Sequence, residues 1–162
     1  MRGIATSLAA SLLFAAAAAA DTPPLSFAQL IDFCGSDTLA GAEAKADRLG
    51  WVRMTDAELK DWRTGFVAHN GSAVEVSGWR RGEESGDALS FWVARGPHSH
   101  RACSYTANDP ARLLHEPTGR FGPPQNLDKR DFGLTASWQL GAMEISYAQV
   151  GKSVVLYVVH SD

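Results

Sequence analysis

The sequence predicts an α+β fold in which N-terminal helices pack on one face of an antiparallel meander sheet of about five to six strands. Residues 26–64 place apolar side chains at helical spacing, whereas from residue 66 the apolar residues alternate as in strands. Helices followed by a run of adjacent strands are typical of an α+β domain. We therefore expect a single domain over residues 21–162, with helices at about 26–64 and the sheet at about 66–160.

The first 20 residues have the pattern of a secretory signal peptide. Arg2 is the only charged residue before Asp21, and the apolar run between them ends in Ala18-Ala19-Ala20. The run is barely long enough to cross a membrane and is rich in weakly hydrophobic alanine, which favours a cleaved signal over an uncleaved anchor. We expect a periplasmic or secreted chain with no membrane span after cleavage.

The charge of the chain argues against a nucleic-acid partner. Its formal net charge is −3, and nucleic-acid binding needs a clustered basic surface. The sequence contains no cofactor motif, and we expect no cofactor. We expect the protein to be a monomer.

The chain has two cysteines, Cys34 and Cys103. Cys34 shares one face of the first helix with Phe27, Leu30 and Ile31, so it faces the core. In an oxidising compartment two cysteines most simply form one disulfide, which here would join helix to sheet. The alternatives are a reduced buried pair or bonds to other chains.

Capping signals place three N-terminal helices. Ser26 begins the first helix, Ser36 can cap a second that ends at Gly50, and the capping box Thr55-Asp-Ala-Glu58 begins a third. We expect this third helix to run for about two turns and to end near Gly65.

Alternating apolar residues predict the strands. We expect strands at residues 74–79, 88–95 and around 103, then at 134–140, 143–147 and 154–159. The last is apolar on both faces, so we place it centrally in the sheet. The face opposite the helices should be exposed and is one candidate binding surface; it would bear Thr135, Ser137, Gln139, Glu144 and Ser146.

Between these groups of strands, Asp109-Pro110 begins a short helix that reaches about His115. Residues 116–131 then contain three prolines and two glycines and have no apolar period, which predicts a long irregular loop. Long loops often carry function. We expect this one to bind a partner through exposed Phe121 as apolar anchor and Arg120, Lys129 and Arg130 as polar contacts.

His98 and His100 are the strongest candidates for chemistry. Alternate residues of a strand point the same way, so two imidazoles could bind Zn²⁺ or Cu²⁺. No third ligand stands at a diagnostic spacing, and two solvated histidines beside a Gly-Pro turn are the simpler interpretation. The alternatives to a binding domain are therefore a metal-binding protein or a metal-assisted hydrolase that uses this pair.

No Gly-x-Ser-x-Gly motif for a serine nucleophile is present. The tryptophans could stack on sugars, but most of them fall on apolar periods, which favours core positions. We interpret the chain as a small, exported, non-enzymatic binding or interaction domain of the bacterial cell envelope. Its partner would be an envelope protein or a small ligand.

Overall fold

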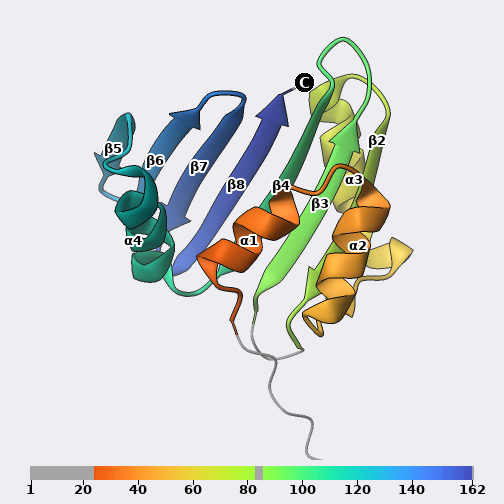
Figure 1. Ribbon diagram of the computed structural model, residues 1–162, viewed down its shortest axis with the longest axis horizontal. Coiled ribbons are helices and arrows are strands. Elements are labelled where there is room, and N and C mark those ends of the chain that lie inside the picture. Colours follow the sequence, from red (N-terminus) through yellow and green to blue (C-terminus); the bar gives the residue numbers. More distant parts are fainter. Residues whose placement is uncertain (1–23, 83–85, 162) are drawn as a thin grey trace, which may run out of the picture.

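The computed structural model describes residues 24–82 and 86–161, which form one eight-stranded antiparallel sheet and four helices (Figure 1). The expected signal peptide, residues 1–20, lies outside the described residues. None of the described helices is long and apolar enough to cross a membrane.

The helices are α1 (Phe27–Cys34), α2 (Leu39–Arg48), α3 (Asp56–Asn70) and α4 (Pro110–Phe121). The strands are β1 (Val52–Arg53), β2 (Val74–Arg80), β3 (Ala88–Ala94), β4 (His100–Ala107), β5 (Asn126–Arg130), β6 (Gly133–Leu140), β7 (Met143–Val150) and β8 (Ser153–Ser161).

The sheet consists of two four-stranded meanders that meet in its middle. The strand order is β1-β2-β3-β4-β8-β7-β6-β5, and β4 pairs with β8. The expectation of a meander of five to six strands was therefore wrong. The two additional strands, β1 and β5, are the two edges of the sheet, and all of their residues are exposed. A strand exposed on both faces has no apolar alternation by which the sequence could reveal it.

The helices lie on both faces of the sheet, which also differs from the expectation of one covered face. Figure 1 shows α1, α2 and α4 in front of the sheet and α3 behind it. The front helices cover the main core, which includes Phe91 and Cys103 of the central strands. On the other face α3 packs so closely on β2 that a Cβ atom at Gly78 would lie 2.8 Å from Cδ2 of Leu59. We call these faces the core face and the α3 face.

The disulfide between Cys34 and Cys103 is confirmed. It joins the end of α1 to β4, with the two Cα atoms 5.4 Å apart. Both cysteines are fully buried, and Phe33 beside Cys34 contacts the rings of Trp79 and Phe91 edge-on. The first helix is thus held to the centre of the sheet by a covalent bond and by aromatic packing.

α3 begins at the predicted capping box, in which Thr55 and Glu58 cap each other's backbone N–H groups. It runs to Asn70 instead of ending near Gly65, and it ends where Gly71 adopts a left-handed conformation with φ of 65°. Phe66, which the sequence suggested was the start of the sheet region, is therefore a helical residue. Its ring stacks on Trp92 of β3 at a centroid distance of 4.5 Å.

The prediction of a long irregular loop at residues 116–131 is wrong. α4 continues through Pro117 as far as Phe121, and β5 occupies half of the remainder. Pro117 is buried on the core side of α4 together with Leu113, so packing offsets the backbone hydrogen bond that a proline cannot donate. The central position predicted for the last strand is confirmed, because β8 lies between β4 and β7.

Candidate functional site

A groove with a volume of about 410 Å³ lies between α3 and the sheet. Residues of α3 form one wall, and side chains from the α3 face of three central strands form the floor. They are Asp61, Trp62, Gly65 and Phe66 of α3, and Ser90, Ser104, Thr106, Val155 and Tyr157 of the strands.

The wall of the groove is aromatic and is held firmly. Trp62 lies over Gly78, where an added Cβ atom would come within 3.1 Å of the indole ring. Phe66 is fixed by its stacking on Trp92, with an angle of 20° between the two ring planes. Both groove residues remain half-buried rather than fully buried, so part of each ring is available to a ligand.

The floor of the groove contains two buried hydroxyl groups. Ser90 of β3 and Ser104 of β4 are paired in the strand register, and their Oγ atoms lie 2.7 Å apart. Each serine hydroxyl carries one hydrogen and two lone pairs. A bond between the two uses one hydrogen and one lone pair, so one hydroxyl hydrogen and three lone pairs of the pair remain unused by it.

Tyr157 continues the floor on the next strand, since it is the register partner of Ser104 on β8. It is 37% exposed, an unusual value for a large side chain on a central strand of this sheet. Its ring can contact an apolar surface while its hydroxyl group forms hydrogen bonds. The groove thus offers aromatic surface on both sides of a hydroxyl pair.

The charges around the groove are acidic or are already paired. Asp61 is the one charged residue among the described residues that line it. At the nearby end of β2, Arg80 forms an ion pair with Glu58. Hydrogen bonds from Thr55, assisted by Arg80, lower the pKa of Glu58, which therefore stays ionised. The groove consequently favours a neutral or cationic ligand over an anionic one.

The lining of the groove resembles that of a small-ligand binding site. A serine nucleophile needs an adjacent base. Ser104 instead bonds to Ser90, and no histidine is among the described residues that line the groove. A mostly apolar groove with a few convergent polar groups is typical of small-ligand sites.

The predicted anchor Phe121 is not exposed. It is half-buried against the core and contacts the ring of Phe27 edge-on, with the ring centroids 6.0 Å apart. The guanidinium group of Arg120 lies 5.6 Å from the centroid of the Phe121 ring. Both residues belong to the last turn of α4 and do not form a loop tip, and Phe121 packs that helix end against the core.

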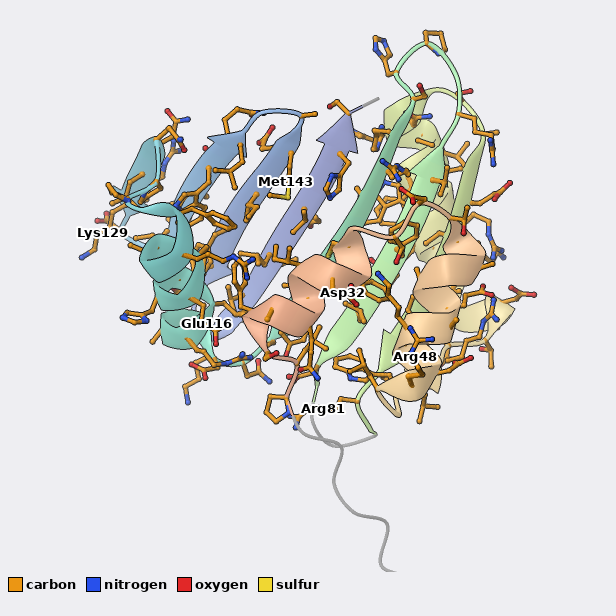
Figure 2. The ribbon with its side chains drawn as sticks, viewed as in Figure 1. Asp32, Arg48, Arg81, Glu116, Lys129 and Met143 are labelled. Carbon is orange, nitrogen blue, oxygen red and sulfur yellow. A yellow bond between two sulfur atoms is a disulfide. The ribbon has the colours of Figure 1, made fainter. Side chains whose placement is uncertain are left out.

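Lys129 and Arg130 lie on the edge strand β5, away from the groove. Figure 2 shows Lys129 at the outer edge of the sheet. Arg130 is paired with Asp128, with Nη2 2.7 Å from the carboxylate. The structure thus divides the four predicted contact residues between the end of α4 and the sheet edge.

His98 and His100 differ in their surroundings. The indole Nε1 of Trp92 donates a hydrogen bond to Nε2 of His100 at 3.2 Å, so Nδ1 carries the proton of the neutral ring and faces the carbonyl oxygen of His98 at 2.9 Å. A metal ion would have to displace one of these bonds. Across the described residues no group of three or more His, Cys, Asp or Glu side chains is placed to hold a metal ion.

A second polar cluster lies on the core face, beside a hollow of about 200 Å³ at the start of α4. Buried Tyr105 donates a hydrogen bond to Asp87 at 3.0 Å, and Asp87 also pairs with Arg81. Arg112 of α4 approaches the Tyr105 hydroxyl at 3.4 Å and bonds to the carbonyl oxygen of Leu25. Because these groups satisfy one another, we interpret this cluster as a structural link between α4, the sheet and the N-terminal segment.

Sequence reasoning missed the groove because its residues are far apart in the chain and none belongs to a motif. One signal was present. Ser90 is the one polar residue in the apolar stretch Ala88–Ala94, and a small polar residue there indicates a face with a special environment. Only the strand register shows that the two serines are neighbours.

Comparisons of the chain with protein-family models, with curated proteins and with solved structures found no match.

Proposed function

We propose that this chain is an exported, non-enzymatic binding domain that takes its ligand in the groove between α3 and the sheet. The observation that carries the proposal is the combination of half-buried aromatic rings and a buried serine pair around one open groove of about 410 Å³. The disulfide supports an oxidising compartment such as the periplasm or the extracellular space, where such bonds persist.

The lining of the groove defines the class of ligand. Trp62, Phe66 and Tyr157 favour a ligand with an apolar face, and the serine hydroxyls favour one with hydrogen-bonding groups on its edge. The Asp61 carboxylate disfavours anions. We infer an uncharged or cationic ligand that is apolar on one side and polar on the other.

Gly65 makes a direct test possible. This residue lines the groove, and a Cβ atom added there would meet no atom within 4 Å. A Gly65→Leu substitution would therefore add an apolar side chain to the wall of the groove with no clash at its Cβ atom, and it would favour the helix because leucine has the higher helix propensity. Gly119→Leu is the matched control, since Gly119 is also helical, also has open space around its Cβ position, and is not among the groove residues.

The experiment is a screen of small neutral and cationic fragments by saturation-transfer NMR on the wild type and both variants. We expect a set of fragments that bind the wild type and Gly119→Leu but not Gly65→Leu, with all three proteins folded by circular dichroism. The proposal fails if no fragment binds, or if Gly65→Leu binds the same fragments as its control.

A further inference from the structure

The polar floor of the groove continues as a row of side chains across the remainder of the sheet. Successive register pairs align six residues on the α3 face, one per strand from β3 to β5: Ser90, Ser104, Tyr157, Ser146, Ser137 and Asn126. Neighbouring strands lie about 4.8 Å apart, so the part of the row from Ser104 to Asn126 is about 19 Å long. We call this set the hydroxyl row.

The far part of the hydroxyl row is open because the two halves of the sheet are built differently. Each half is a four-stranded meander whose last strand, β4 or β8, lies in the middle of the sheet. In the first half α3 is inserted between β1 and β2 and covers this face. In the second half β5 and β6 are joined by the short turn at Asp131 and Phe132, and none of the described helices covers the row there.

The hydroxyl row can supply many hydrogen bonds to a ligand. Over most of its length these must come from side chains and not from the backbone. The strands β3, β4, β8, β7 and β6 are paired on both sides, so their backbone groups are already used in the ladders, and β5 at the edge is paired on one side. Ser146 donates to Glu144 at 2.9 Å, and Asn126 donates to Ser137 at 3.1 Å. The oxygen atoms of both serines keep free acceptor capacity, and both residues are partly exposed.

The charges along the α3 face argue against an anionic polymer as the ligand. Glu144 and Asp128 both lie on the face that bears the hydroxyl row, and Asp61 lies beside the groove. Arg130, at the outer edge, is paired with Asp128. A polyanion such as a nucleic acid or an acidic polysaccharide would meet repulsion without compensation.

We propose that the ligand is a neutral oligosaccharide chain, with one end in the groove and the remainder along the hydroxyl row toward β5. A pyranose ring has a C–H face that can stack on the rings of Trp62 and Tyr157 and a rim of hydroxyl groups that can bond to the serines. This inference rests on the proposed function of the groove, and it adds the chemical class of the ligand and its direction.

The test is isothermal titration calorimetry with sugars of different length and charge. The neutral probes are cellobiose and cellohexaose, and chitobiose and chitohexaose; the acidic probe is a hexamer of galacturonic acid. We expect at least one neutral hexasaccharide to bind at least about fivefold more tightly than its disaccharide, which corresponds to one or two additional hydrogen bonds. We expect the acidic hexamer to bind more weakly than that neutral hexasaccharide.

Two variants test the two ends of the proposed site separately. The double variant Ser137→Ala, Ser146→Ala should weaken the hexasaccharide at least about fivefold and leave the disaccharide unchanged, because only the longer chain reaches these residues. Gly65→Leu should weaken both sugars. Thr64→Ala is the control for hydroxyl loss, since Thr64 bonds to the Lys60 carbonyl oxygen within α3 and is not among the groove residues.

The outcomes distinguish this inference from the proposal on which it rests. Neutral sugars that fail to bind, equal affinities for short and long chains, or an acidic hexamer that binds as well as the neutral ones would each overturn the oligosaccharide inference. If fragments still bind the wild type and are blocked by Gly65→Leu, the groove remains the ligand site with another ligand. If neither fragments nor sugars bind, both proposals fail.

Discussion

Cys34 and Cys103 are 69 residues apart in the chain, and their disulfide fastens the first helix to the central strand β4. The bond lies on the core face, whereas the groove lies on the opposite face of the same strand through Ser104, the next residue. Stability and binding can therefore be examined separately in this protein, because neighbouring residues of one strand serve opposite faces.

Removal of the disulfide should destabilise the protein strongly. We expect the free energy of unfolding of the Cys34→Ala, Cys103→Ala variant to be about 4 kcal/mol lower than that of the wild type. The disulfide closes a long loop, and without it the unfolded chain has a higher conformational entropy. Urea unfolding measures the loss. Reduction should lower the stability of the wild type and leave the double variant unchanged; a wild type that is insensitive to reduction would contradict the prediction.

Phe121 should behave as a packing residue. We expect Phe121→Ala to lower the free energy of unfolding by about 2 kcal/mol, less than for a fully buried phenylalanine because the ring is half-buried. Phe132→Ala is the matched control, since Phe132 is 70% exposed, and it should change stability by less than about 0.5 kcal/mol. Urea unfolding measures both changes. If the two substitutions had equally small effects on the free energy of unfolding, Phe121 would be a surface residue, as the sequence predicted.

Gly65 within α3 and Gly71 directly after it should respond in opposite directions to substitution by alanine. Gly65→Ala should stabilise the protein by up to about 1 kcal/mol, because Gly65 is in the helix interior with open space around it. Gly71→Ala should destabilise it by about 1 kcal/mol, because φ is 65° there and a Cβ atom is strained in that region. Thermal unfolding of both variants is the measurement, and a shift of the same sign in the two would show that α3 ends elsewhere.

Alkaline pH should weaken the fold through Tyr105. Burial, reinforced by the Asp87 carboxylate, raises the pKa of Tyr105 from 10.0 to about 12. As the pH rises, the unfolded state therefore loses the Tyr105 proton before the folded state does. The contribution of this proton to the free energy of unfolding is complete below pH 10 and is lost as the pH rises toward 12. Tyr105→Phe should be less stable than the wild type at neutral pH, because the hydrogen bond to Asp87 is lost. Its free energy of unfolding should fall less steeply than that of the wild type as the pH rises from 10 to 12.

Burial also raises the pKa of Tyr147, so the wild type and Tyr105→Phe must be compared directly. Urea unfolding at several pH values gives the two slopes. Identical slopes would mean that Tyr105 ionises as readily in the folded protein as in the unfolded chain.

The histidine pair should not hold a metal ion. Both ring nitrogens of His100 form hydrogen bonds, so we expect titration with Zn²⁺ or Cu²⁺ to give no stoichiometric complex by native mass spectrometry. The His98→Ala, His100→Ala variant is the control. One metal ion per chain in the wild type, absent from this variant, would instead support the metal-binding alternative.

The sequence was sufficient for the disulfide, the capping box at Thr55 and Glu58, and the inner strands. The disulfide followed from the presence of two cysteines, the capping box from residues close in the chain, and the inner strands from the apolar alternation of a half-buried strand. The same reasoning was wrong where tertiary contacts decide the conformation. Pro117 remains helical because it packs on the core, and Gly65 does not end α3 because Phe66 stacks on Trp92.

That helices and an antiparallel sheet are joined by one disulfide could be predicted from the residues alone. The eight strands of the sheet, the position of α3 on the second face, and the alignment of Ser90, Ser104 and Tyr157 became visible in the folded chain. Edge strands carry no burial pattern, and strand register is a pairing between distant segments. A binding groove built from such pairings cannot be recognised before the strands are aligned.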